Sequence, residues 1–96
     1  MEWTFAQTDP KQELARLHLF SVKKCQSDGD VQFTITVREY TTPPGGEPMR
    51  FVAEADKQTN QSTAPFTPRG WGNTLIKALS ECVAAIDKFP YEGPRD

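Results

Sequence analysis

The sequence is poor in the residues that most often build catalytic and metal sites. Its 96 residues include one histidine, His18, and two cysteines, Cys25 and Cys82. The cysteines lie far apart and outside any Cys-x-x-Cys pair, so we expect reduced thiols in a reducing compartment, with a disulfide between them as the alternative. A zinc site is disfavoured because no residues show ligand spacing. We expect neither a metal nor a cofactor.

Long apolar runs and an excess of basic charge are also missing. No run approaches the ~20 residues that span a bilayer, and the N-terminus lacks the basic start and apolar core of a signal peptide. These absences predict a cytoplasmic protein that does not bind membranes. The net charge of −2 gives no overall basic field, which disfavours nucleic acid as a partner.

The chain length predicts a single domain with a thin core of two layers. A chain of this size buries roughly 60–65% of the surface that its unfolded form exposes. We expect an irregular lead-in over residues 1–8, one domain over residues 9–90 and a frayed polar tail over residues 91–96.

Two strands joined by a tight turn are the clearest elements. Within Val31–Tyr40, apolar residues alternate with polar ones, as in a strand with one buried face: Val31, Phe33, Ile35 and Val37. Asp28-Gly29 is a strong hairpin signal, because glycine accepts the positive φ of such turns. It predicts that Leu17–Cys25 pairs with Val31–Tyr40.

A third strand is predicted over Met49–Asp56, after a proline-rich loop over residues 41–48. Ala53 and Ala55 lie on its apolar face and leave space for a helix. The polar stretch Lys57–Gly72 reads as a long connection, of a length that is often functional. The alternative is that the third strand continues into its first residues, which would shorten the connection.

One helix is predicted over Asn73–Phe89, capped by Asn73 or Thr74 and stopped by Pro90. Its apolar residues fall on one face: Leu75, Leu79, Cys82, Val83 and Ile86. The expected fold is therefore α+β, a three-stranded antiparallel sheet with the helix across one face. Asp9-Pro10-Lys11-Gln12 adds the signal of a short N-terminal helix; the alternative is that the first strand begins early.

The helix start carries a family resemblance. Gly72-Asn73-Thr74-Leu75-x-x-Ala78-Leu79, followed by Ala85-Ile86, resembles the HicB-like antitoxin domain. The resemblance implies a fold without activity of its own that binds a protein partner, of toxin type in that family.

A second resemblance is topological. A helix, three strands and a helix is the order of double-stranded RNA-binding domains, which grip phosphates with basic residues at the start of the last helix. Here that region offers Arg69 and Lys77. An RNA-binding domain is therefore the alternative function.

Three residues of the long connection are the candidate partner-binding site: Phe66, Arg69 and Trp71. They lie in a stretch stiffened by Pro65 and Pro68, and tryptophan and arginine are enriched among interface hot spots. The alternative is that Trp71 fastens the loop to the core, and both hold if Phe66 and Arg69 face outward while Trp71 anchors.

No set of residues predicts catalysis, and we expect a protein that is not an enzyme. His18 lies between Leu17 and Leu19 and reads as structural, and Cys82 on the apolar helical face reads as an inert thiol. Cys25 lies beside two lysines, an environment in which thiols are often reactive, but it also reads as a strand-end residue. Glu54, Asp56 and Glu39 read as parts of a solvated, charge-mixed sheet surface.

The sheet edges predict a homodimer. If the strands lie in chain order, the edges are Leu17–Cys25 and Met49–Asp56, and exposed edges pair with other chains. The edge at Met49–Asp56 carries more charged side chains, which deter pairing with another chain. We therefore expect pairing through the first strand, at Leu19, Phe20 and Val22.

Overall fold

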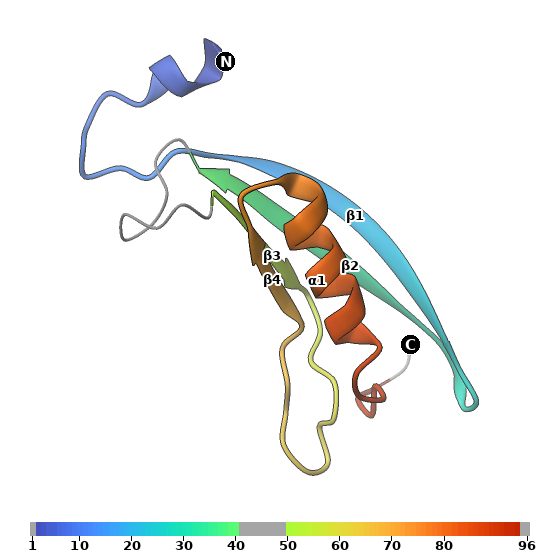
Figure 1. Ribbon diagram of the computed structural model, residues 1–96. Coiled ribbons are helices and arrows are strands. Elements are labelled where there is room, and N and C mark those ends of the chain that lie inside the picture. Colours follow the sequence, from blue (N-terminus) through green and yellow to red (C-terminus); the bar gives the residue numbers. More distant parts are fainter. Residues whose placement is uncertain (1, 41–49, 95–96) are drawn as a thin grey trace.

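The described part of the chain forms a four-stranded antiparallel sheet with one helix across one face (Figure 1). The computed structural model describes residues 2–40 and 50–94. The elements, in chain order, are η1 (Glu2–Ala6), β1 (Ala15–Gln26), β2 (Gly29–Tyr40), β3 (Phe51–Ala55), β4 (Arg69–Gly72) and α1 (Leu75–Ile86). The predicted α+β class is confirmed, with four strands in place of three. The expected loop over residues 41–48 and the start of the third strand at Met49 lie outside the described residues.

The hairpin of β1 and β2 forms as predicted. The two strands pair along their whole length, from Ala15 opposite Tyr40 to Gln26 opposite Gly29. Ser27 and Asp28 form the loop, and Gly29, the first residue of β2, has a φ of 127°. Glycine adopts this backbone conformation without the steric cost that other residues meet, which explains the glycine at this position.

The core lies between the sheet and α1. The alternating residues of β2 are all buried there, together with Ala53 and Ala55 of β3. From the helix, Ala78, Cys82 and Ile86 are fully buried, while Leu75, Leu79 and Val83 pack around them. The small side chains of β3 let α1 approach the sheet, so the helix face that the sequence predicts is confirmed.

The predicted long connection is wrong at its C-terminal end, because Arg69–Gly72 forms β4. This strand pairs with β3 from Phe51 opposite Gly72 to Glu54 opposite Arg69. The inward-facing residues of β4 are Gly70 and Gly72, which are buried. The strand therefore lacks the apolar alternation by which strands are found in a sequence. A further antiparallel bridge joins Thr59 to Phe66, so the loop between β3 and β4 extends the hairpin that these two strands form.

The expected helix near Asp9 is also wrong. The Asp9 carboxylate accepts a hydrogen bond from the Lys11 amide at 2.9 Å, and the Gln12 amide donates to the Asp9 carbonyl. These bonds form a turn, a conformation that aspartate also favours, and β1 then begins at Ala15. The early-strand alternative holds, and η1 occupies part of the lead-in that was expected to be irregular.

The helix is shorter than predicted at both ends. Thr74 is the N-cap, and its hydroxyl accepts a hydrogen bond from the Lys77 amide at 3.2 Å. At the other end, the Lys24 ammonium donates to the carbonyls of Ile86 at 2.8 Å and Phe89 at 2.6 Å. Lys24 thus satisfies carbonyls that a helix end leaves without partners. No helix in the described part of the chain has the length and apolar character to cross a membrane.

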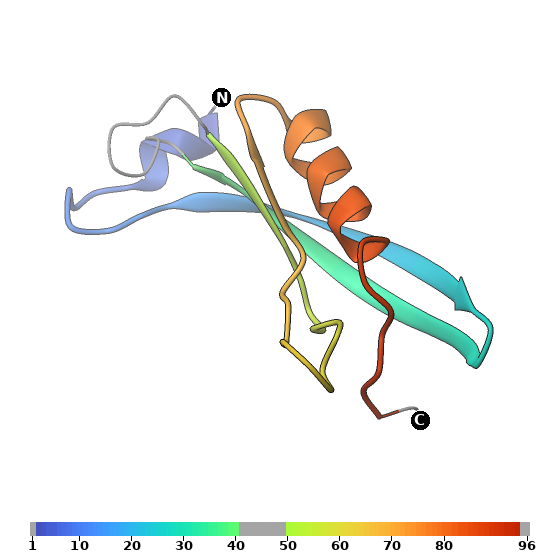
Figure 2. The same cartoon turned by 60° about the horizontal axis from the view of Figure 1, so that its bottom comes forward.

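The first residue of the expected tail, Tyr91, packs against the sheet after the helix ends. Tyr91 is 5% exposed, and its ring meets that of Phe33 edge to face at 6.0 Å between centroids. The Gln26 amide group binds both the backbone N–H and the carbonyl of Tyr91, at 2.7 and 3.1 Å. The chain after α1 therefore lies between the end of the β1–β2 hairpin and the loop that joins β3 to β4 (Figure 2).

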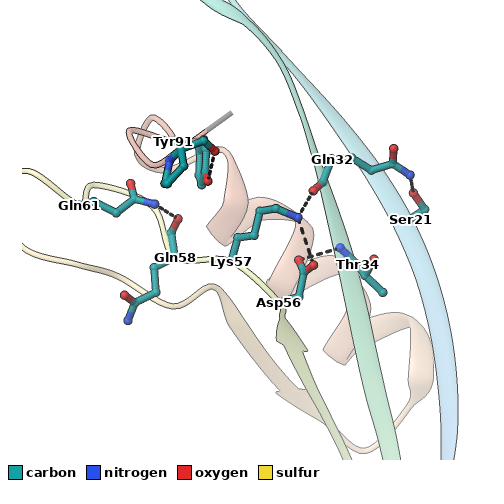
Figure 3. Close-up of polar contacts among 9 residues, drawn as sticks. Ser21, Gln32, Thr34, Asp56, Lys57, Gln58, Gln61 and Tyr91 are labelled. Atoms are coloured by element: carbon teal, nitrogen blue, oxygen red, sulfur yellow. Dashed lines mark hydrogen bonds and ion pairs between the residues drawn. The ribbon is translucent and has the colours of Figure 1, made fainter. Parts of the chain in front are cut away.

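Polar side chains fix the long loop to the sheet where β3 ends. The Asp56 carboxylate accepts a hydrogen bond from the Thr34 amide at 2.9 Å, and the Lys57 ammonium donates to the Gln32 carbonyl at 2.7 Å (Figure 3). Lys57 also pairs with Asp56. Asp56 therefore holds the loop to β2.

Candidate partner-binding site

A groove on the surface beside β4 is lined by the three predicted partner-binding residues. Phe66, Arg69 and Trp71 border it together with Pro65 and Thr67, and its volume is about 360 Å³. All five residues come from one short stretch of chain. The structure therefore brings the predicted set together, although it assigns the members different roles.

Trp71 is the exposed wall of this groove. Its side chain lies on the sheet face opposite the helix, and the residue is 43% exposed. It faces outward because Gly70 and Gly72 take the inward positions: a Cβ built on Gly70 would lie 2.7 Å from the Cys82 nitrogen. The helix approaches the β4 backbone so closely that only glycine fits. Trp71 is thus no anchor to the core.

Phe66 has the anchoring role that was considered for Trp71. Its ring packs against Phe89, with 5.2 Å between centroids, and the Lys88 ammonium lies 5.9 Å from its centroid. Phe66 is half-buried by these contacts. The prediction that Phe66 faces outward while Trp71 anchors is therefore reversed.

Arg69 lies on the same outward face as Trp71. Its Nε donates to the Glu54 carboxylate across the β3–β4 pair at 2.8 Å. Both side chains are well exposed, so this ion pair stabilises the fold by at most about 1 kcal/mol. Bonding through Nε leaves the terminal guanidinium nitrogens as donors for another carboxylate.

The edge of the sheet at β4 is protected by the helix. The Trp71 amide, which points away from β3, donates to the Glu81 carboxylate of α1 at 3.1 Å. Glu81 also pairs with Lys77 one helical turn earlier. A carboxylate on an edge amide removes a donor that an added strand needs. The sequence does not predict this contact, because β4 carries no strand pattern.

The other edge of the sheet is β1, as predicted, but the candidate dimer residues divide between two faces. Leu19 is 67% exposed on the outer face, whereas Phe20 and Val22 pack against the rim of the core. The second expected edge, Met49–Asp56, is wrong because β4 covers β3. Leu17, exposed beside Leu19, belongs to the same outer surface.

His18 and Glu39 form a structural pair. The His18 Nε2 lies 2.9 Å from a Glu39 carboxylate oxygen across the β1–β2 hairpin. Glu39 is buried, so its place on a solvated surface is wrong. Glu39 follows Val37 by two residues, so the alternation of β2 places it on the same buried face as Val31 and Val37. This placement could have been read from the sequence. Within residues 2–40 and 50–94, no three His, Cys, Asp or Glu residues gather as a metal site would require.

The two thiols differ in surroundings. Both are free; Cys25 is exposed, and Cys82 is buried between the helix and β4. Burial, with a smaller contribution from the charge of Glu54, raises the pKa of Cys82 to about 11. Because the thiolate is the nucleophile, Cys82 is inert at neutral pH.

Thiol labelling tests this difference. We expect Cys25 to react with a disulfide reagent at pH 8 within the dead time of manual mixing, while Cys82 reacts only as the protein opens. A Cys25→Ser variant should therefore show no fast phase, and denaturant should restore one full equivalent. Fast labelling of Cys82 in folded Cys25→Ser protein would contradict the packing of α1 on β4.

Comparisons with known proteins give no relatives. No family model, no curated protein and no solved structure matches the chain. The groove and the two sheet edges are therefore the observations on which function is argued.

Proposed function

We propose that this chain is a non-enzymatic, cytoplasmic protein-binding module of HicB-like type, and that its partner docks in the groove lined by Phe66, Arg69 and Trp71. The observation that carries the proposal is this groove, which is lined by both an exposed tryptophan and an exposed arginine. Trp and Arg are the residues that most often dominate binding energy at interfaces. The family resemblance adds a toxin-type protein as the class of partner.

The shape and chemistry of the groove favour one kind of ligand, an extended peptide segment of the partner. Phe66, Pro65 and Trp71 offer apolar surface for one aliphatic side chain. Arg69 offers guanidinium donors for a carboxylate, and such charge-assisted hydrogen bonds are stronger than neutral ones. The ligand is therefore a segment with an aliphatic residue and an acidic residue close together.

The buried groups support a binding role over a catalytic one. Burial keeps the Cys82 thiol neutral, and the His18 ring nitrogen is hydrogen-bonded to the Glu39 carboxylate across the β1–β2 hairpin. Both are the residues that a nucleophilic mechanism would use. Their places in the structure serve packing.

RNA binding has less support. The net charge of −2 gives no overall basic field that would attract a phosphate backbone. The described elements also begin with a short 3-10 helix and include a fourth strand, unlike the order that suggested an RNA-binding domain.

Selection from a displayed peptide library tests the proposal without knowledge of the partner. Peptides that enrich on the folded protein should share an aliphatic residue near Asp or Glu. Trp71→Ala should weaken their binding at least about 30-fold, since hot spots contribute about 2 kcal/mol or more.

Ile76→Ala is the matched control, because Ile76 is 68% exposed on the helix, away from the groove residues. It should leave the affinity unchanged. Enriched peptides that bind Trp71→Ala as tightly as the original protein would overturn the proposed site.

A further inference from the structure

The outer edge of β1 is an open row of hydrogen-bonding groups. The Tyr40 amide donates to the Arg50 carbonyl, and the Thr34 carbonyl accepts from Asp56, so even-numbered residues of β2 face β3. Odd-numbered residues of β2 then face even-numbered residues of β1. The odd-numbered residues of β1, Leu17 and Leu19 among them, point their backbone groups away from the sheet. No other described segment makes backbone hydrogen bonds to them.

The basic residues of β1 each have a partner within their own chain, which weakens the protection that edge charges normally give. Edge lysines deter pairing between chains, and β1 carries two of them. The Lys24 ammonium is bound to carbonyls at the end of α1, and Lys23 lies 3.8 Å from Asp30 of β2. The third cation, Arg16, stacks on Trp3 with 4.9 Å to the ring centroid. The β4 edge, by contrast, is short and bonded to Glu81.

Apolar side chains on both faces of this edge are only partly covered by the rest of the chain. On the outer face, Leu17 and Leu19 are both more than half exposed. On the inner face, α1 packs on β2, β3 and β4, and Phe20 and Val22 of β1 remain only partly covered. A strand added at β1 would cover parts of both groups.

We propose that this edge pairs with β1 of a second copy, antiparallel about a two-fold axis at Leu19. Closed two-fold dimers are the commonest assemblies of identical chains, and two such sheets would join into one. This inference does not depend on the proposed function, because the groove lies at the opposite edge of the sheet.

The basic residues of β1 and the exposed side chain of Leu19 together favour one register. With the axis at Phe20, Lys24 of one copy lies opposite Arg16 of the other, and like charges directly opposite destabilise a pair. With the axis at Ser21, the exposed Leu19 lies opposite Lys23, and the two Leu19 side chains do not meet.

With the axis at Leu19, every basic residue of β1 faces an uncharged one. Arg16 lies opposite Val22, Lys23 opposite Ala15, and Lys24 opposite Leu14. The two Leu19 side chains then meet on the outer face at a hydrogen-bonded pair, with about 5.5 Å between their Cα atoms.

The mass in solution tests the dimer. Light scattering at micromolar concentration should give twice the 10.8 kDa of one chain. Leu19→Lys should raise the dimer dissociation constant at least about tenfold without changing the circular dichroism, since Leu19 is exposed. Ile76→Lys, an equally exposed site on α1, should remain dimeric. A single-chain mass for the original protein, or a dimer unaffected by Leu19→Lys, would overturn the proposal.

Cross-linking tests the register. In a Cys25→Ser background, Leu19→Cys should form a disulfide with its own copy under mild oxidation, because the Cα separation lies within disulfide range. Ser21→Cys should not, because Ser21 would face Leu17. Cross-linking at Ser21 and not at Leu19 would reject the axis.

Discussion

Gly70→Val is expected to leave the protein largely unfolded at room temperature. The added side chain would start from a Cβ that lies 2.7 Å from the Cys82 nitrogen and 2.9 Å from the Glu81 Cβ. The nitrogen belongs to the helix backbone, so the helix must leave β4 to make room. Overpacking where side chains adjust costs about 1–3 kcal/mol, and here the total approaches the 5–15 kcal/mol that stabilises a typical domain.

Arg69→Val is the matched control for this experiment. It introduces the same residue at the neighbouring position of the same strand, where the side chain faces outward. It loses only the exposed pair with Glu54, so we expect a change within about 1 kcal/mol. Denaturant unfolding followed by tryptophan fluorescence measures both. Equal losses in the two variants would mean that α1 does not rest on β4.

Phe33→Ala is expected to cost about 3–5 kcal/mol, the range for removing a buried aromatic ring. Phe33 of β2 is fully buried, and it is the ring against which Tyr91 packs. Its loss leaves a cavity and also frees the segment after the helix. The midpoint of urea unfolding should therefore fall sharply.

Phe5→Ala removes the same ring at a site that is 84% exposed, and it should change the stability by less than about 0.5 kcal/mol. A loss for Phe33→Ala no greater than that for Phe5→Ala would mean that the core lies elsewhere.

The regular parts of the fold were predictable because they repeat. The alternation in β2, the glycine of its turn and the apolar face of α1 each follow a short period, and each is confirmed. The position of Glu39 followed from the same alternation, but its charge argued against burial. The histidine that makes this burial acceptable lies on another strand, opposite Val37.

The fourth strand could not be predicted because its inward positions are glycines. Gly70 and Gly72 supply no apolar signal, since the helix itself fills the space where side chains would be. Missing β4 led to two further errors, the second sheet edge and the role of Trp71. In a strand, a shift of one residue in the pairing reverses which side chains face the core. Trp71 faces outward because β4 pairs with β3 in the register that turns Gly70 and Gly72 toward the helix.

The emission of Trp71 tests the central claim, that an acidic-aliphatic peptide binds in the groove beside β4. In a Trp3→Phe variant, Trp71 is the remaining tryptophan, and titration with a selected peptide should shift its emission to the blue and saturate as the exposed ring is covered. The same peptide with its acidic residue replaced by the amide should require a higher concentration, because Arg69 loses its charged partner. Binding of the peptide, measured calorimetrically, with no change in Trp71 emission would contradict the account.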